Sequence, residues 1–326
     1  MRDRFGRELT YLRISVVDRC NLRCLYCMPA HGAAFEGWSE LLSYEEIVTL
    51  ARTFAGLGIT KIRITGGEPL VRPNIAELVF RLREIHEIRE LALSTNGVFL
   101  KAQAGRLKAA GLDRVNISLD TLDRKKFQEI ARIDRLHDVL EGIEEALLLG
   151  IGPLKLNAVL MKGINDDEIL DLVRFAIAKS IEVRFIELMP TNGGVQLDVK
   201  ERFFSAEEAK ARIGEEFSLA PVDAYFSSPA QVFSIEGTRA RVGFISPLSC
   251  VFCARCNRLR LKANGALKTC LHGKEDLDLK GLLRSGTPCE LIKRKIEEVV
   301  WGRPEQHFLN EPQVPHHDFQ MSHVGG

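Results

Sequence analysis

The stretch that decides the fold runs from Tyr11 to Cys27 and reads YLRISVVDRCNLRCLYC. Its first seven residues, YLRISVV, are rich in β-branched and aromatic side chains, as is typical of a β-strand. Three cysteines follow the strand, in the spacing Cys20-x3-Cys24-x2-Cys27. The segment therefore predicts a strand that leads directly into a loop carrying three thiols.

Five similar runs follow at regular spacing: KIRIT (61–65), ELALST (90–95), RVNISL (114–119), LKLNAVLM (154–161) and EVRFIEL (182–188). The segments between them place apolar residues three and four apart, a helical pattern that predicts parallel βαβ units. A complete eightfold barrel takes about 250 residues, so six units indicate either an incomplete barrel or an open doubly wound sheet. We predict the α/β fold of an incomplete (β/α)6 TIM-type barrel over residues 1–190. Both architectures place catalytic and ligand-binding residues at the carboxyl ends of the strands.

The regular alternation of strand and helix patterns ends at residue 190. Shorter runs, QVFSIEG (231–237) and RARVGFIS (239–246), are joined by turn residues and predict a smaller C-terminal α+β extension over 191–326. Beyond Trp301 the chain shows no periodicity, so His316 and His317 are expected to lie in an irregular, solvated tail.

Charge and hydropathy narrow the choice of partners. The 45 basic and 44 acidic residues give a net charge of +1, so no general attraction to nucleic acid or to an anionic membrane is expected. No apolar stretch approaches the roughly 20 residues that span a bilayer, and the first 15 residues lack the apolar core of a secretory signal. We therefore expect a cytoplasmic protein that holds any anionic substrate by a local cluster of charges.

The eight cysteines are clustered, which favours metal binding or catalysis over disulfides in a reducing compartment. Three thiolates a few residues apart can bind three irons of a four-iron cluster and leave the fourth iron open. In radical chemistry with S-adenosylmethionine (SAM), that open iron binds the cofactor. The alternative is a zinc site, for which the segment offers only His31 as a nearby fourth ligand.

Two further features fit the radical SAM superfamily. Tyr26 precedes the third cysteine, at an aromatic position that contacts the cofactor's adenine in that superfamily. TGGEP at 65–69 resembles the segment whose backbone meets the methionine amino group, and its glycines permit close approach of a ligand. Taken alone, this segment fits an ordinary turn equally well.

A second three-cysteine set, Cys253-x2-Cys256-x13-Cys270, lies in the extension. Arg258 and Arg260 follow it one residue apart, so in an extended chain both guanidinium groups point the same way and suit phosphate oxygens. Cys250 offers another register: with it, four thiolates would close the cluster for electron relay. We favour the three-ligand register and interpret Cys250 and Cys289 as ordinary thiols.

The order of motifs over the whole chain resembles the GTP 3′,8-cyclases, the radical SAM family that begins molybdenum cofactor biosynthesis. The strings that carry this resemblance are LRIS (12–15), DRCN (18–21), IRITGGEP (62–69), NISLD (116–120), RFIELM (184–189), the second cysteine set and the terminal Gly-Gly. Ser94 departs from the family, which usually has threonine there, but serine keeps the hydroxyl group.

The resemblance implies two [4Fe-4S] clusters and SAM as cofactors. The implied cluster ligands are Cys20, Cys24, Cys27, Cys253, Cys256 and Cys270; the implied SAM contacts are Tyr26, Gly67, Ser118 and Met189; the implied GTP contacts are Arg13, Arg63, Ser94, Lys155, Arg258 and Arg260. A 5′-deoxyadenosyl radical would remove the ribose 3′ hydrogen of GTP, so that C3′ attacks C8 of guanine, while the second cluster holds the base. The product would be (8S)-3′,8-cyclo-7,8-dihydroguanosine 5′-triphosphate.

The resemblance also implies partners and a role for the tail. An electron donor would reduce the cluster, and the product would pass to cyclic pyranopterin monophosphate synthase. The last two residues, Gly325 and Gly326, would reach into the active site. The sequence leaves open whether the protein is a monomer or a homodimer.

Two other classes of protein share some of these features. A two-cluster electron-transfer protein would leave TGGEP and the basic strand positions unexplained. A radical SAM enzyme with an accessory cluster that acts on a peptide would leave the terminal Gly-Gly unexplained. The cyclase interpretation accounts for all of these features together.

Overall fold

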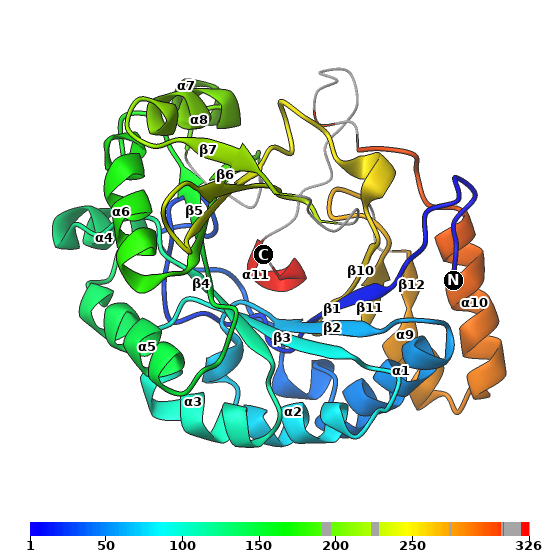
Figure 1. The fold of residues 1–326 in the computed structure, drawn as a ribbon. Coiled ribbons are helices and arrows are strands. Elements are labelled where there is room, and N and C mark those ends of the chain that lie inside the picture. Colours follow the sequence, from blue (N-terminus) through cyan, green and yellow to red (C-terminus); the bar gives the residue numbers. More distant parts are fainter. Residues whose placement is uncertain (191–196, 223–227, 274–275, 308, 310–320, 326) are drawn as a thin grey trace.

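The computed structural model describes residues 1–190, 197–222, 228–273, 276–307, 309 and 321–325. Six parallel strands lie side by side in chain order: β1 (Tyr11–Ser15), β2 (Lys61–Thr65), β3 (Glu90–Thr95), β4 (Arg114–Ser118), β5 (Lys155–Leu160) and β6 (Glu182–Glu187). Their helices form the outer wall (Figure 1): α1 (Tyr44–Gly56), α2 (Ile75–Arg83), α3 (Leu100–Ala109), α4 (Arg124–Ala131), α5 (Leu136–Leu148) and α6 (Ile169–Lys179). This confirms the predicted incomplete TIM-type barrel.

Alternation along the strands separates the core from the barrel interior. Leu12 and Ile14 of β1 are fully buried under the helices, whereas Arg13, between them, lines the interior cavity. β2 repeats the pattern with Ile62 and Ile64 in the core. Because side chains point alternately to the two faces of a strand, one strand supplies both the core and the cavity.

The helices carry their own boundary signals. Ser43 caps α1 by accepting a hydrogen bond from the backbone of Glu46, whose side chain bonds back to the backbone of Ser43. Such a cap stabilises a helix by about 1 kcal/mol. The apolar face of α1, including Leu50 and Phe54, then packs on the sheet.

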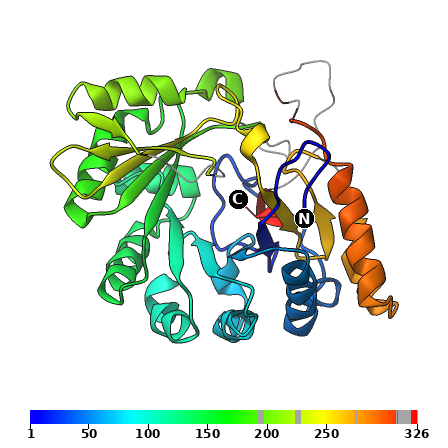
Figure 2. The same ribbon diagram turned by 45° about the vertical axis from the view of Figure 1, so that its right-hand side comes forward.

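The smaller α+β extension is also present, and its strands continue the barrel sheet at both edges (Figures 1 and 2). At one edge β10 (Arg258–Leu261) pairs in parallel with β1, and β11 (Ala266–Lys268) and β12 (Leu277–Asp278) follow antiparallel. At the other edge β9 (Arg241–Ile245) pairs in parallel with β6, and β8 (Gln231–Ile235) and β7 (Leu219–Pro221) follow. Eight neighbouring strands are therefore parallel, and the sheet described here stays open between β12 and β7.

The remaining helices lie in the extension and at the tail. They are α7 (Val199–Arg202), α8 (Ala206–Gly214), α9 (Leu279–Arg284), α10 (Cys289–Trp301) and α11 (Met321–Val324). The short α11 lies within the ring of strands (Figure 1), with Ser322 and Val324 buried, so residues 321–324 are helical although no periodicity beyond Trp301 predicted it. His316, His317 and Gly326 lie outside the described residues. None of the described helices has the length and apolar character of a membrane span.

Candidate active site

The barrel encloses a cavity of about 940 Å³. The six cysteines of the two sets line this cavity, as do all ten residues implied as SAM or GTP contacts. Cys250 and Cys289 are exposed and are not part of its lining. The structure therefore brings together every residue singled out for the site among those it describes.

The first cysteine set follows the carboxyl end of β1. Burial raises the pKa of Cys20 to about 11 and that of Cys27 to about 12, and it raises the pKa of Cys24 well above its usual value. The thiols also raise one another's pKa, because each would carry a negative charge close to the next. Three half-buried thiols on one loop that lines the cavity fit a shared cationic group such as an iron–sulfur cluster.

The TGGEP segment is fastened to the loop of the first cysteine set. Gly67 donates its backbone N–H to the carbonyl of Val17 (2.7 Å), and a Cβ on Gly67 would lie only 2.3 Å from the carbonyl oxygen of Arg19. No other residue fits there without moving the backbone. Glu68 is fully buried and accepts hydrogen bonds from Thr95 Oγ1 (2.7 Å) and from the backbone of Asn96 (2.6 Å). TGGEP and the STNG residues at 94–97 are thereby joined into one rigid wall.

Asp120 supports Tyr26 at the same end of the barrel. The Tyr26 hydroxyl donates to Asp120 Oδ2 (2.7 Å), and the backbone of Val159 donates to Oδ1 (2.8 Å). Burial raises the pKa of Asp120 to about 6, against the effect of these hydrogen bonds. The cavity lining nearby includes Ser118, at the end of β4, and Met189, just after β6.

The second cysteine set lies at the opposite end of the strands. Cys256 comes just before β10, whose first residue, Arg258, pairs with Tyr11 at the start of β1. Burial would raise the pKa of Cys256, but the charges of Arg258 and Arg303 overcome that effect and lower the pKa to about 6. Burial raises the pKa of Cys253, and the neighbouring thiols Cys270 and Cys256 add to the effect. Three adjacent thiols, one of them ready to ionise, again fit a metal cluster.

A buried charge network holds this second set. Arg303 Nη2 donates to Cys256 Sγ (3.0 Å), and its Nη1 donates to the Cys256 carbonyl (2.8 Å). Arg7 Nη1 donates to the Cys253 carbonyl (3.0 Å), and Arg7 Nε bonds to Asp3 (2.5 Å). Asp3 therefore balances the positive charges of Arg7 and Arg303. Residues from both ends of the chain thus hold the loop of the second cysteine set in place.

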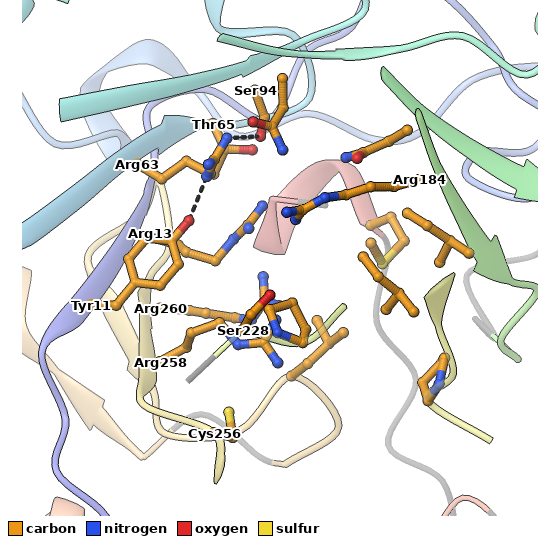
Figure 3. Close-up of a pocket in the computed structure, with 18 of the residues that line it drawn as sticks. Tyr11, Arg13, Arg63, Thr65, Ser94, Arg184, Ser228, Cys256, Arg258 and Arg260 are labelled. Atoms are coloured by element: carbon orange, nitrogen blue, oxygen red, sulfur yellow. Dashed lines mark hydrogen bonds between the residues drawn. The ribbon is translucent and has the colours of Figure 1, made fainter. Parts of the chain in front are cut away.

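Between the two cysteine sets, basic side chains converge on the cavity (Figure 3). Arg63 donates through Nη1 to Ser94 Oγ (3.1 Å) and through Nε to the Tyr11 hydroxyl. Burial lowers the pKa of Arg13 to about 10, with Arg63 and Arg258 adding to the effect. Burial would raise the pKa of Tyr11, but the cations Arg63, Arg13 and Lys61 lower it to about 7. Cations in such density favour a ligand with several negative charges.

The tail reaches this cluster. Arg260 Nη1 donates to the carbonyl of Gly325 (2.6 Å). Gly325 has φ +75°, and a Cβ there would lie 2.3 Å from Thr65 Cγ2, so only glycine fits. The backbone of Ser322 bonds to Cys27 and thereby lowers that thiol's pKa, against the larger effect of burial. The tail thus runs from the first cysteine set to the cations.

Sequence reasoning did not assign several residues of this lining. They are Tyr11, Lys61, Arg114, Arg184 and Arg303. The first four occupy alternate strand positions that face the interior, so their period of two was the available signal. Arg303 follows α10 and meets Cys256 only through the tertiary fold, so no local pattern marks it.

Comparison with known proteins agrees with this geometry. The Radical SAM superfamily model matches residues 14–176, and the Molybdenum Cofactor Synthesis C model matches residues 181–309. The chain is therefore a radical SAM enzyme. It is 47% identical to the GTP 3′,8-cyclase of Moorella thermoacetica, over 100% of both chains, and 45% identical to that of Peptoclostridium acidaminophilum, over 99% and 98%. The chain belongs to the GTP 3′,8-cyclase family of molybdenum cofactor biosynthesis, and that membership implies a [4Fe-4S] cluster and SAM as cofactors.

Solved structures share the fold at low identity. Streptococcus suis SuiB bound to the precursor peptide SuiA matches with a TM-score of 0.62 at 17% identity, over 85% of this chain and 65% of that chain. SuiB bound to S-adenosylmethionine matches with a TM-score of 0.60, also at 17% identity, over 82% and 61%. The chain thus spans about two thirds of SuiB. The likeness to SuiB concerns the fold alone. The family assignment rests on the GTP 3′,8-cyclases that match over the full length of this chain.

Proposed function

We propose that this protein converts GTP to (8S)-3′,8-cyclo-7,8-dihydroguanosine 5′-triphosphate, with hydrogen removal at ribose C3′ and bond formation between C3′ and C8 of guanine. The observation that carries the proposal is one cavity with a three-cysteine set at each end and a dense group of cations between them. Within the proposal, residues 1–190 form the SAM-binding part and residues 191–326 complete the GTP-binding part.

The first cysteine set, Cys20, Cys24 and Cys27, would hold the cluster that binds SAM. That cofactor pair, when bound, supplies the 5′-deoxyadenosyl radical. Tyr26, Gly67, Ser118 and Met189 surround the adjoining part of the cavity and would orient the cofactor. Glu68 and Asp120 lie behind this part of the cavity, where their hydrogen bonds hold the STNG residues and Tyr26 in place.

The cations would hold the triphosphate of GTP. Arg13, Arg63, Arg258 and Arg260 come from three neighbouring strands, and Lys155 approaches from β5. Ser94 already accepts a hydrogen bond from Arg63, so its hydroxyl proton remains to donate to a phosphate oxygen. About four negative charges on the nucleotide would be balanced within the cavity, although the chain as a whole has a net charge of only +1.

Cys253, Cys256 and Cys270 would be the only protein ligands of a second [4Fe-4S] cluster, whose open iron would hold the guanine. Their place in the cavity lining supports this register. Cys250 lies outside the lining and contacts the Gln231 side chain at 3.9 Å. A four-thiolate relay would need Cys250 to turn inward.

The test is anaerobic reconstitution with iron, sulfide, SAM, a reductant and GTP deuterated at C3′. We expect a cyclised nucleotide and deuterium in the 5′-deoxyadenosine, both measured by mass spectrometry. Deuterium-free 5′-deoxyadenosine without a cyclised nucleotide would refute the proposal. The electron donor and transfer of the product to a pterin-forming synthase are further parts of the same proposal.

A further inference from the structure

Glu182 places a carboxylate next to cations that would bind an anion. It is the first residue of β6, where it pairs with Lys155 on β5 and with Arg241 on β9. Its side chain is 7% exposed. A buried carboxylate repels phosphate and costs free energy to desolvate, so its presence at this position requires a reason.

The contacts of Glu182 show what it holds. Lys155 Nζ donates to Glu182 Oε2 (2.6 Å), and Arg184 Nε donates to Glu182 Oε1. The two cations are thereby fixed on either side of one carboxylate. Figure 3 shows Arg184 with its guanidinium group directed into the cavity toward the other arginines.

The same arrangement recurs on the neighbouring strands β2, β3 and β4. Glu90, the first residue of β3, forms ion pairs with Lys61 (3.0 Å) and with Arg114. Cations that begin strands are thus held by glutamates that also begin strands. The recurrence indicates that the carboxylates organise the cations and do not merely happen to lie among them.

The charges around Lys155 make Glu182 important for its protonation. Burial, Arg184 and Arg114 lower the pKa of Lys155, Glu182 raises it, and together these effects set it at about 8. The groups that face this region are Arg114 and the neutral Asn116 from β4, Glu182 and Arg184 from β6, and Arg241 from β9. Without Glu182, every charged group among these neighbours is positive.

We propose that Glu182 is a positioning residue for the anion-binding cations: its carboxylate holds Lys155 and Arg184 side by side and keeps the Lys155 ammonium charged for contact with the triphosphate. This inference rests on the proposed binding of GTP in the cavity. Because Glu182 would act through Lys155, its loss should change how GTP affinity depends on pH.

The experiment measures the GTP dissociation constant by anaerobic calorimetry on the reconstituted holoenzyme, from pH 7.5 to 9. Four proteins form a cycle: wild type, Glu182→Gln, Lys155→Arg and the double variant. Arginine keeps its charge throughout this range, so the Lys155→Arg background removes the titration that Glu182 is proposed to control. Glu216→Gln, at an exposed pair with Arg174, is the matched control for loss of a glutamate.

We expect affinity in Glu182→Gln to start falling at a lower pH than in wild type, by up to about tenfold per pH unit because one proton is linked to binding. In the Lys155→Arg background the Glu182→Gln change should leave the pH profile unmoved. Coincident profiles for wild type and Glu182→Gln would overturn this inference while leaving the proposed function intact. Failure of the wild type to bind GTP would overturn both. Cluster absorbance and thermal unfolding confirm that each variant is folded.

Discussion

The two ends of the barrel use the same ligand type in opposite electrostatic surroundings. At the carboxyl end of the strands, the three thiols lie near Glu68 and Asp120, and the pKa of each thiol is raised. At the amino end, Arg258 and Arg303 lower the pKa of Cys256 to about 6, against the effect of burial. Thiolates can bind iron in either setting, so the cysteines alone do not determine what each end binds. Buried carboxyl groups, whose pKa values burial raises, lie at the carboxyl end, whereas the arginines at the amino end favour an anionic ligand.

The strongest test of this division is Cys24→Ala. Loss of one thiolate from the first set should reduce formation of 5′-deoxyadenosine by on the order of 100-fold or more, because the cluster that binds SAM is lost. The measurement is chromatography of 5′-deoxyadenosine under a strong reductant. Cys289→Ala, at an exposed thiol outside the cavity, is the control. Cleavage near the wild-type rate in Cys24→Ala would show that SAM is bound elsewhere.

Deleting Gly325 and Gly326 should produce the next largest effect. The deletion removes the carbonyl that Arg260 binds at 2.6 Å, so the cations and the substrate lose their alignment. We expect turnover of GTP to fall by on the order of 100-fold, with both clusters and GTP binding nearly intact. If the truncated enzyme turns over GTP at the rate of the full-length enzyme, the tail has no part in the reaction.

Arg258→Ala and Arg260→Ala should weaken the binding of GTP. Loss of one charge-assisted contact to phosphate costs about 1.5–3 kcal/mol, which is roughly a 10- to 150-fold rise in the GTP dissociation constant. Cleavage of SAM in the absence of GTP should stay at the wild-type level. Arg255→Ala, an exposed arginine in the same loop, provides the comparison. If neither cavity variant changes GTP affinity, these arginines do not hold the nucleotide.

Cys250→Ala should have the smallest effect. Because Cys250 is exposed and outside the cavity lining, the variant should keep its full iron content and most of its activity. Iron and acid-labile sulfide analysis provides the measurement. If this single change removes half the iron, the four-thiolate relay is correct and the amino end does not bind substrate through an open iron.

The sequence predicted the strands and the thiols well because both are local patterns. KIRIT, for example, corresponds to β2 without any shift in boundaries. The rule that functional residues follow the carboxyl ends of strands located the first cysteine set, but it does not lead to Lys155 or Arg258, which begin β5 and β10. Lys155 came from the family resemblance, whereas Arg258 was found with Arg260 as a pair of guanidinium groups suited to phosphate oxygens.

The partners of these cations escaped prediction for a physical reason. Glu182 meets Lys155 only because β5 and β6 pair in one particular register, 27 positions apart in the chain. The bond from Arg303 to Cys256 spans 47 positions. Such pairs are set by tertiary structure, and no periodicity within one strand or helix reports them.

Enclosing the cations has a consequence for selectivity among the polyanions of a cell. Arg13, Arg63 and Arg260 are each less than 10% exposed, so their charge is not displayed on the outer surface. Surface charges attract any polyanion within a screening distance of about 8 Å at physiological ionic strength. A cavity of about 940 Å³ has the size of a small-molecule site, which suits a mononucleotide and is far too small for a folded RNA. The enzyme can therefore concentrate positive charge around a small substrate without being sequestered by nucleic acid.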